Sequence, residues 1–229
     1  MDNLSNDLAS IIKDYVIFKP KNKEELQEAV DLWCEEKDEA LNKYGHISNW
    51  DTSLITDMSE LFTHAIDFND NINNWDVSNV EDMNNMFHMA VKFNQPLDSW
   101  DVSSVTNMSK MFYSAVKFNQ PLDSWDVSSV TNMYEMFLRS FSFNQPLNSW
   151  NVSSVNCMAC MFGGSSSFNQ PLDSWNVSNV SNMNGIFCLA SSFNQPLNSW
   201  DISNVIYYEE MFEEASEFDK NNALWYDFD

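Results

Sequence analysis

Apolar residues recur along this chain with a period of 25 residues. Tryptophan shows the period most clearly, because it occupies positions Trp50, Trp75, Trp100, Trp125, Trp150, Trp175, Trp200 and Trp225. Columns of valine, methionine and phenylalanine repeat with the same spacing, as Val105, Met108 and Phe112 do in the copy that begins at Trp100. A fixed period of this size indicates one structural unit that is stacked on copies of itself.

Two shorter periods inside each unit predict its secondary structure. Residues 100–102 alternate between apolar and polar, which is typical of a short half-buried strand. The spacing that follows matches one face of a helix and comprises Val105, Met108, Phe112 and Ala115. Pro121 then predicts a turn, because proline disfavours helix at the residue before it. The expected fold class is therefore α/β, a solenoid of 25-residue strand-turn-helix repeats with the strands paired in a parallel sheet.

The two ends of the array need different structures, since a terminal repeat would otherwise expose its core. Residues 1–46 are predicted to be an N-terminal capping segment with an amphipathic helix at 22–44, in which Asn22 and Glu25 fit a capping box. Residues 47–224 form the predicted seven-repeat solenoid, and residues 225–229 a short C-terminal cap.

The net charge of the chain indicates which classes of partner it could bind. The net charge of −23 repels phosphate, which disfavours nucleic acid and anionic membranes and favours a basic protein. A simpler interpretation is that acidity keeps an apolar rod in solution. No apolar run is long enough for a membrane span. The first residues also lack the pattern of a secretory signal, so we expect a location inside the cell or within a particle rather than at a cell surface.

Small polar and acidic residues flank each tryptophan and form the best candidate binding surface. If tryptophan and valine point inward, these neighbouring positions point outward together. We call this surface the acidic face, and it consists of Asp76, Ser78, Ser99, Asp101, Ser103, Ser124, Asp126, Ser128 and Asp201. The alternative is that the aspartates and serines only satisfy backbone groups in turns.

Few residues suggest catalysis or metal binding. Cys157 and Cys160 are spaced as C-x-x-C, and Cys188 follows one repeat later, but no fourth ligand is evident. No base and nucleophile recur together. We therefore expect no catalytic residues, no cofactor, no metal site and no enzymatic activity, while the role of the three cysteines stays open.

The unit FNQPLDSWDVSSVTNMSKMFYSA resembles the 25-residue repeat of the BspA-like leucine-rich-repeat surface proteins, also known as a mycoplasma lipoprotein-type repeat. Similar arrays occur in some protists and large DNA viruses. The motif F-N-x-P-L-x-x-W-x-V-x-x-V-x-x-M-x-x-M-F carries the resemblance over residues 47 to about 225. The resemblance implies a leucine-rich-repeat-like solenoid that binds proteins, often in adhesion.

Three functional hypotheses follow. The first is a non-enzymatic scaffold that binds another protein, with a basic partner favoured by the charge. The second is a structural subunit of a large assembly such as a virus particle. The third is a cell-surface adhesin, although the chain as given shows neither a signal peptide nor a lipobox cysteine. The sequence leaves the oligomeric state open.

Overall fold

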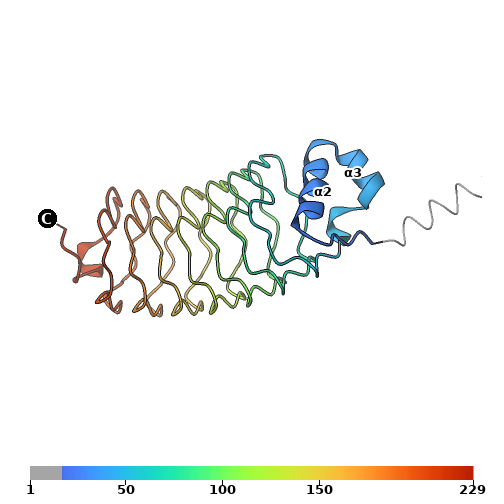
Figure 1. The fold of residues 1–229 in the computed structure, drawn as a ribbon. Helices are drawn as coiled ribbons and strands as arrows, with labels where there is room; N and C mark the ends of the chain where they lie inside the picture. The colour runs from blue at the N-terminus through green and yellow to red at the C-terminus, as the bar shows by residue number, and fades with distance from the viewer. Residues whose placement is uncertain (1–16, 229) are drawn as a thin grey trace, which may run out of the picture.

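The computed structural model describes residues 17–228, so that residues 1–16 of the predicted capping segment and Asp229 of the predicted C-terminal cap lie outside it. Figure 1 shows an elongated stack of similar backbone turns with two helices at its N-terminal end. These helices are α2 (Lys23–Glu35) and α3 (Lys37–Tyr44), and two short 3-10 helices are η1 (Ile47–Asn49) and η2 (Lys220–Asn222).

The N-terminal helices arise much as the local sequence predicts, but as two elements. Asn22 begins α2 by accepting a hydrogen bond from the backbone N–H of Glu25 at 2.9 Å, which satisfies one orphan amide of the first turn. Glu36 has φ −133°, outside the helical region, and this residue divides the predicted 22–44 helix into α2 and α3. Trp33 and other apolar residues of α2 are buried against the first repeats.

The predicted α/β solenoid of strand-turn-helix repeats is wrong. In the described part of the repeats there is neither an α-helix nor a strand, and each 25-residue unit, here called a coil, is a series of β-turns. The amides of Met111, Tyr113 and Ala115 each donate to the carbonyl three residues earlier, at 3.0–3.2 Å. Lys110 and Ser114 have φ 56° and 52°. An α-helix requires every residue to be right-handed, so two left-handed residues four positions apart exclude it.

The same apolar spacing suits these turns, which explains the error. The inward-facing residues of the segment are Met108, Met111, Phe112 and Ala115, all fully buried. Turns with a left-handed residue at 110 and 114 bring these side chains to one side, as a helix of the same sequence would do. The short strand predicted at 100–102 is replaced by a turn in which the amide of Val105 donates to Val102 at 2.9 Å.

Backbone hydrogen bonds between coils run through the segment that the sequence assigned to the helix. Every second amide from residue 108 to residue 114 donates to the carbonyl 24 positions later, at N···O distances of 2.8–3.0 Å. Parallel bridges link successive coils at Asp57, Asp82, Asn107, Asn132, Cys157, Asn182 and Tyr207. The pairing therefore stacks seven coils, although isolated bridges replace the predicted continuous sheet.

Aromatic side chains fill the interior and repeat from coil to coil. The rings of Trp125 and Trp150 are parallel, with centroids 6.4 Å apart. The indole N–H of Trp125 donates to the buried carbonyl of Leu97 in the preceding coil at 3.0 Å, so that a donor inside the core is satisfied. At the Asn-Gln-Pro turn, the amide of Asn119 donates to the side chain of Asn94 at 2.9 Å. Side chains thus add bonds between coils to those of the backbone.

Replacing Ser114 by glycine distinguishes this turn structure from a helix. Ser114 has φ 52°, which glycine adopts without strain, so we expect Ser114→Gly to raise the free energy of unfolding by up to about 1 kcal/mol. If the segment were a helix, the same substitution would instead lower the free energy of unfolding by about 1 kcal/mol. The matched control is Ser142→Gly, at a half-buried position without positive φ, which is expected to lose about 0.5–1 kcal/mol. Urea unfolding measures both, and a clear loss for Ser114→Gly would contradict the turn structure.

Candidate functional site

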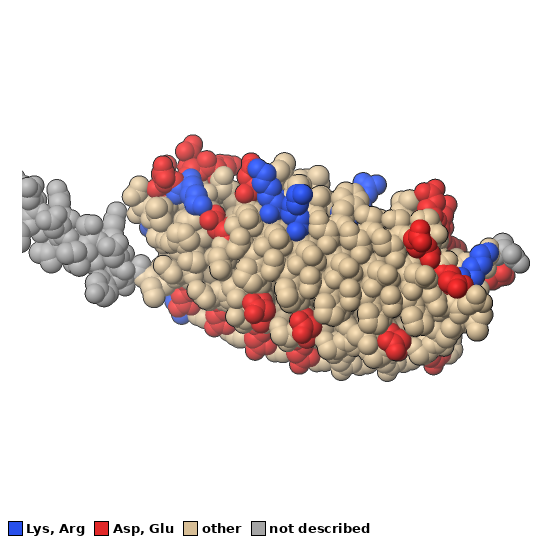
Figure 2. Space-filling model, turned by 180° about the vertical axis from the view of Figure 1, so that it is seen from behind, with Lys and Arg blue, Asp and Glu red and all other residues tan. Residues whose placement is uncertain are grey.

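The aspartates of the acidic face lie exposed along the stack. Figure 2 shows acidic side chains in a row along one long edge of the molecule. Four aspartates and two serines of the face are exposed, namely Asp76, Asp101, Asp126, Asp201, Ser99 and Ser124, while Ser78, Ser103 and Ser128 are half-buried. Because consecutive coils stack in register, each column of the face presents its side chain once per coil, at the ~4.8 Å spacing of paired backbones.

Each of these aspartates also holds a turn together. Oδ1 of Asp101 accepts from the amide of Ser103 at 3.1 Å and from its hydroxyl at 2.6 Å. The same pair of bonds occurs at Asp76 with Ser78. These bonds agree with the alternative interpretation, in which aspartate satisfies turn backbone. In both pairs, however, Oδ2 has no hydrogen-bond donor among the described residues, so one carboxylate oxygen remains for a partner.

The serine hydrogen bonds also keep the carboxylates charged. The hydroxyl and amide of Ser128 lower the pKa of Asp126, and those of Ser203 lower the pKa of Asp201. Hydrogen bonds to the charged form favour ionisation. The serine partners therefore strengthen the preference of Asp126 and Asp201 for the charged form.

Ser99 and Ser124 have a different role from the other serines of the face. The hydroxyl of Ser124 donates to the carbonyl of Asp98 in the preceding coil at 3.1 Å. The amide of Ser99 donates to the side chain of Asn73 at 3.1 Å. Both serines therefore connect neighbouring coils at the corner before the tryptophan.

Lys19 binds Asp51, which precedes Asp76 by one repeat in the same column. The sequence analysis did not predict this contact. Its ammonium group lies 2.8 Å from Oδ2 of Asp51 and donates to the hydroxyl of Ser53 at 2.9 Å. Asp51 and Ser53 occupy the same columns as Asp76 and Ser78 one coil later. Hydrogen bonds from Lys19 and then Ser53 lower the pKa of Asp51 to about 2. The chain thus contains one occupied example of a lysine on an aspartate–serine pair.

Two further lysines attach the N-terminal helices to the coils. Lys23 of α2 pairs with Asp57 at 3.0 Å and also donates to the hydroxyl of Ser59. Lys37 of α3 pairs with Asp70 at 2.8 Å. No motif in the sequence indicated these pairs, because each joins residues more than 30 positions apart.

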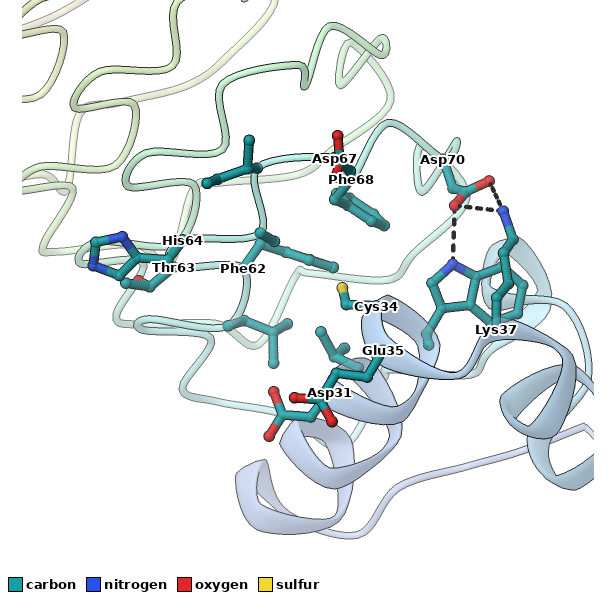
Figure 3. Close-up of a pocket in the computed structure, with 15 residues that line it drawn as sticks. Asp31, Cys34, Glu35, Lys37, Phe62, Thr63, His64, Asp67, Phe68 and Asp70 are labelled. Atoms are coloured by element: carbon teal, nitrogen blue, oxygen red, sulfur yellow. Dashed lines mark hydrogen bonds and ion pairs between the residues drawn. The ribbon is translucent and has the colours of Figure 1, made fainter.

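A cavity of about 570 Å³ lies between α2 and the first coils. Figure 3 shows Cys34 facing Phe62 within it, with His64 on the far side and Lys37 bound to Asp70 at the rim. Cys34 as a whole is exposed, but the protein atoms around its thiol displace water, and this local desolvation, followed by the carboxylates of Asp31 and Asp70, raises the pKa of Cys34 to about 11. The thiol is therefore protonated at neutral pH and is a poor nucleophile.

The structure brings together two of the three histidines. The rings of His64 and His88 lie 5.3 Å apart, and His88 also contacts Tyr113 at 4.7 Å between centroids. Burial and then the neighbouring His64 lower the pKa of His88. The two histidines meet because bonded residues of neighbouring coils are 24 positions apart rather than 25, as in the bond from the amide of His64 to the carbonyl of His88.

The remaining cysteines lie half-buried on successive coils. Cys157, Cys160 and Cys188 are all free thiols, and burial raises the pKa values of Cys160 and Cys188. Within residues 17–228, no three His, Cys, Asp or Glu side chains are grouped in a way that would hold a metal ion. Neither helix that the structure describes has the length and apolar character needed to cross a bilayer.

Comparison with known proteins identifies the repeat. The sequence model of a family described as "Mycoplasma protein of unknown function, DUF285" matches residues 34–148 and matches again over residues 121–225. No curated protein and no solved structure matches the chain. The two overlapping matches agree with the internal repetition, since both cover several coils.

The Lys19–Asp51 pair predicts a specific dependence of stability on acid. The pKa of Asp51 is about 2 in the folded protein and 3.8 without partners. The pair therefore contributes its full stability above about pH 4 and loses it as the pH falls towards 2. We expect Lys19→Met to unfold more easily than the wild type above pH 4, with the difference vanishing near pH 2.

The control is Lys21→Met, because the ammonium of Lys21 has no carboxylate partner among the described residues. Urea unfolding from pH 2 to pH 7, with NMR titration of the Asp51 carboxyl group, checks this prediction. An Asp51 pKa that stays the same in Lys19→Met would contradict it.

Cys34 should react slowly with alkylating reagents. With its pKa near 11 instead of 9.0, the thiolate population at pH 8 is roughly a hundredfold smaller than in the unfolded chain. We expect iodoacetamide to modify Cys34 about a hundredfold faster in urea than in the folded protein, followed by mass spectrometry of the peptide. Asp31→Asn should raise the folded rate, and equal rates in both states would show that the thiol is not perturbed.

Proposed function

The chain belongs to the DUF285 family, and we propose that it is a non-enzymatic repeat scaffold that binds a basic protein through its acidic face. The partner would present lysine or arginine side chains in a row, one for each coil or for every second coil. Each side chain would sit between an aspartate Oδ2 and the neighbouring serine.

The contact of Lys19 with the first coil is the observation that carries this proposal. Lys19 takes the ammonium position at Asp51 and Ser53, at 2.8 and 2.9 Å. The same aspartate and serine columns continue at Asp76, Asp101 and Asp126, where the described residues supply no lysine or arginine partner. A single exposed pair contributes only about 0.2–1 kcal/mol, so useful affinity requires several coils to act together. A repeated array provides that multiplicity.

Further parts of the proposal concern class and location. A role without catalysis is supported by the protonated Cys34 thiol in the cavity between α2 and the first coils. Kinship with BspA-like surface proteins is supported by the F-N-x-P-L-x-x-W motif, and a location within a cell or particle is part of the same proposal. These parts stand apart from the acidic face and do not depend on it.

Charge reversal on the face tests the proposal. A quantitative pull-down from the native source compares the wild type with Asp76→Lys, Asp101→Lys and Asp126→Lys combined. We expect one discrete basic partner, whose affinity falls about tenfold or more in the triple variant because three pairs become repulsive.

The matched control carries Glu28→Lys, Glu35→Lys and Glu39→Lys, which alter the net charge equally on exposed positions of α2 and α3. This control should retain the partner. If both variants lost affinity for the partner equally, net charge alone would explain the loss, and the proposal of a specific binding face would be contradicted. Size fractionation adds a further outcome, since co-fractionation with a large particle in all variants would support a structural subunit and contradict the scaffold.

A further inference from the structure

At positions 206 and 207 the last coil has large side chains that the other coils lack. Position 206 is Ile206, whereas the same column in the other coils contains only polar residues, such as Thr131 and Ser181. Position 207 is Tyr207, whereas the other coils have Asp, Asn or Cys there. The repeat therefore does not account for these two residues, which need another explanation.

These residues lie exposed at the C-terminal edge of the stack, a surface that we define by Ile206, Tyr207, Tyr208 and Leu224. The exposed fractions of Ile206 and Leu224 are 66% and 75%, and those of Tyr207 and Tyr208 are 52% and 45%. Ile206, Tyr207 and Tyr208 are consecutive in the chain, and a group of exposed large side chains indicates an interaction site. The same column as Tyr208 is fully buried at Met183, because another coil covers it there.

Backbone amides at this edge lack partners. In the preceding coil, the amides of Met183, Gly185 and Leu189 donate to the last coil at 2.7–2.9 Å. The equivalent amides of the last coil belong to Tyr208, Glu210 and Glu214, which find no acceptor within the described residues. The C-terminal residues cover only part of the coil, since Tyr226 and Phe228 pack on Phe212. The edge therefore offers unpaired donors to an added segment, as an open sheet edge does.

The charge around the edge selects the partner. Five exposed glutamates surround it, namely Glu209, Glu210, Glu213, Glu214 and Glu217. Lys220 is the one nearby base in the sequence from 207 to 228, and its ammonium lies over the ring of Phe228 at 5.2 Å. Figure 2 shows acidic side chains gathered at this end of the molecule.

We propose that the C-terminal edge binds a basic, extended segment of another protein, which lies parallel to the last coil as an additional layer. Its carbonyl groups accept from the amides of Tyr208, Glu210 and Glu214, as in β-strand addition. Its apolar side chains cover Ile206 and Tyr207, and its lysines or arginines pair with the glutamates. This site is separate from the acidic face and does not rest on the function proposed for it.

A second copy of the chain fits this edge poorly. Two C-terminal edges would bring the same glutamates together, which is repulsive. The opposite end of the stack is covered by α2, whose Trp33 contacts Trp50 of the first coil.

A defined peptide tests the proposal. The probe is a synthetic octapeptide of alternating lysine and valine, titrated into ¹⁵N-labelled full-length protein at 150 mM salt. We expect saturable shifts at Tyr208, Glu210 and Glu214, with hydrogen exchange of these amides slowed about tenfold or more. The matched peptide of alternating glutamate and valine should not bind.

Two variants locate the site. Ile206→Thr combined with Tyr207→Asn restores the residues of the inner coils and should fold normally, but should weaken the lysine–valine peptide about tenfold through lost apolar contact. The combined Asp76→Lys, Asp101→Lys and Asp126→Lys variant should bind this peptide within about twofold of the wild type, because salt screens distant charges. If this triple variant binds the peptide but not the native partner, the acidic face and the C-terminal edge act independently.

Three outcomes would overturn the proposal. One is the absence of binding up to millimolar peptide. Another is unchanged binding in the Ile206→Thr, Tyr207→Asn variant. The third is self-association of the free protein in sedimentation that the same variant abolishes, since a second copy would then be the occupant.

Discussion

The structure depends on the hydrogen bonds that alternate amides of one coil donate to carbonyls of the next. This alternation requires the backbone to reverse direction every few residues, and left-handed residues such as Lys110 and Ser114 make that possible. Those conformations carry a local cost. The bonds between coils offset it, since a coil without neighbours would leave both its amides and its apolar side chains exposed. Stability is therefore a property of the stack, as in other repeat proteins.

Stacking in register also makes the surface repetitive. A side chain that faces outward in one coil faces outward in all of them, so the aspartate columns become a linear array of charge. The first position of that array is occupied by Lys19, whose contacts with Asp51 and Ser53 provide the geometry for the interaction proposed at the other positions. In the last described coil the situation is the opposite, because the amides of Tyr208 and Glu210 find no acceptor among the described residues.

Much of the repeat could be predicted because it is visible in the order of apolar and polar residues along the chain. The 25-residue period, the inward position of Trp100 and Phe112, and the start of α2 at Asn22 all follow from the pattern and are seen in the structure. The helix predicted around Met108 was wrong, since apolar residues three and four positions apart suit both a helix and successive turns. Glycine would have indicated left-handed positions, but residues such as Lys110, Glu135 and Arg139 occupy them instead.

The sequence by itself determined the period, the inward-facing columns and the outward-facing aspartates, because these depend on which side chains avoid water. Only the tertiary structure decided the backbone conformation and the partners of individual groups. Lys19 and Asp51 are 32 positions apart, and the amides of Tyr208 and Glu210 find no acceptor among the described residues. Such relations join residues that are far apart in the sequence, and they arise from how the backbone is packed rather than from any local pattern of residues.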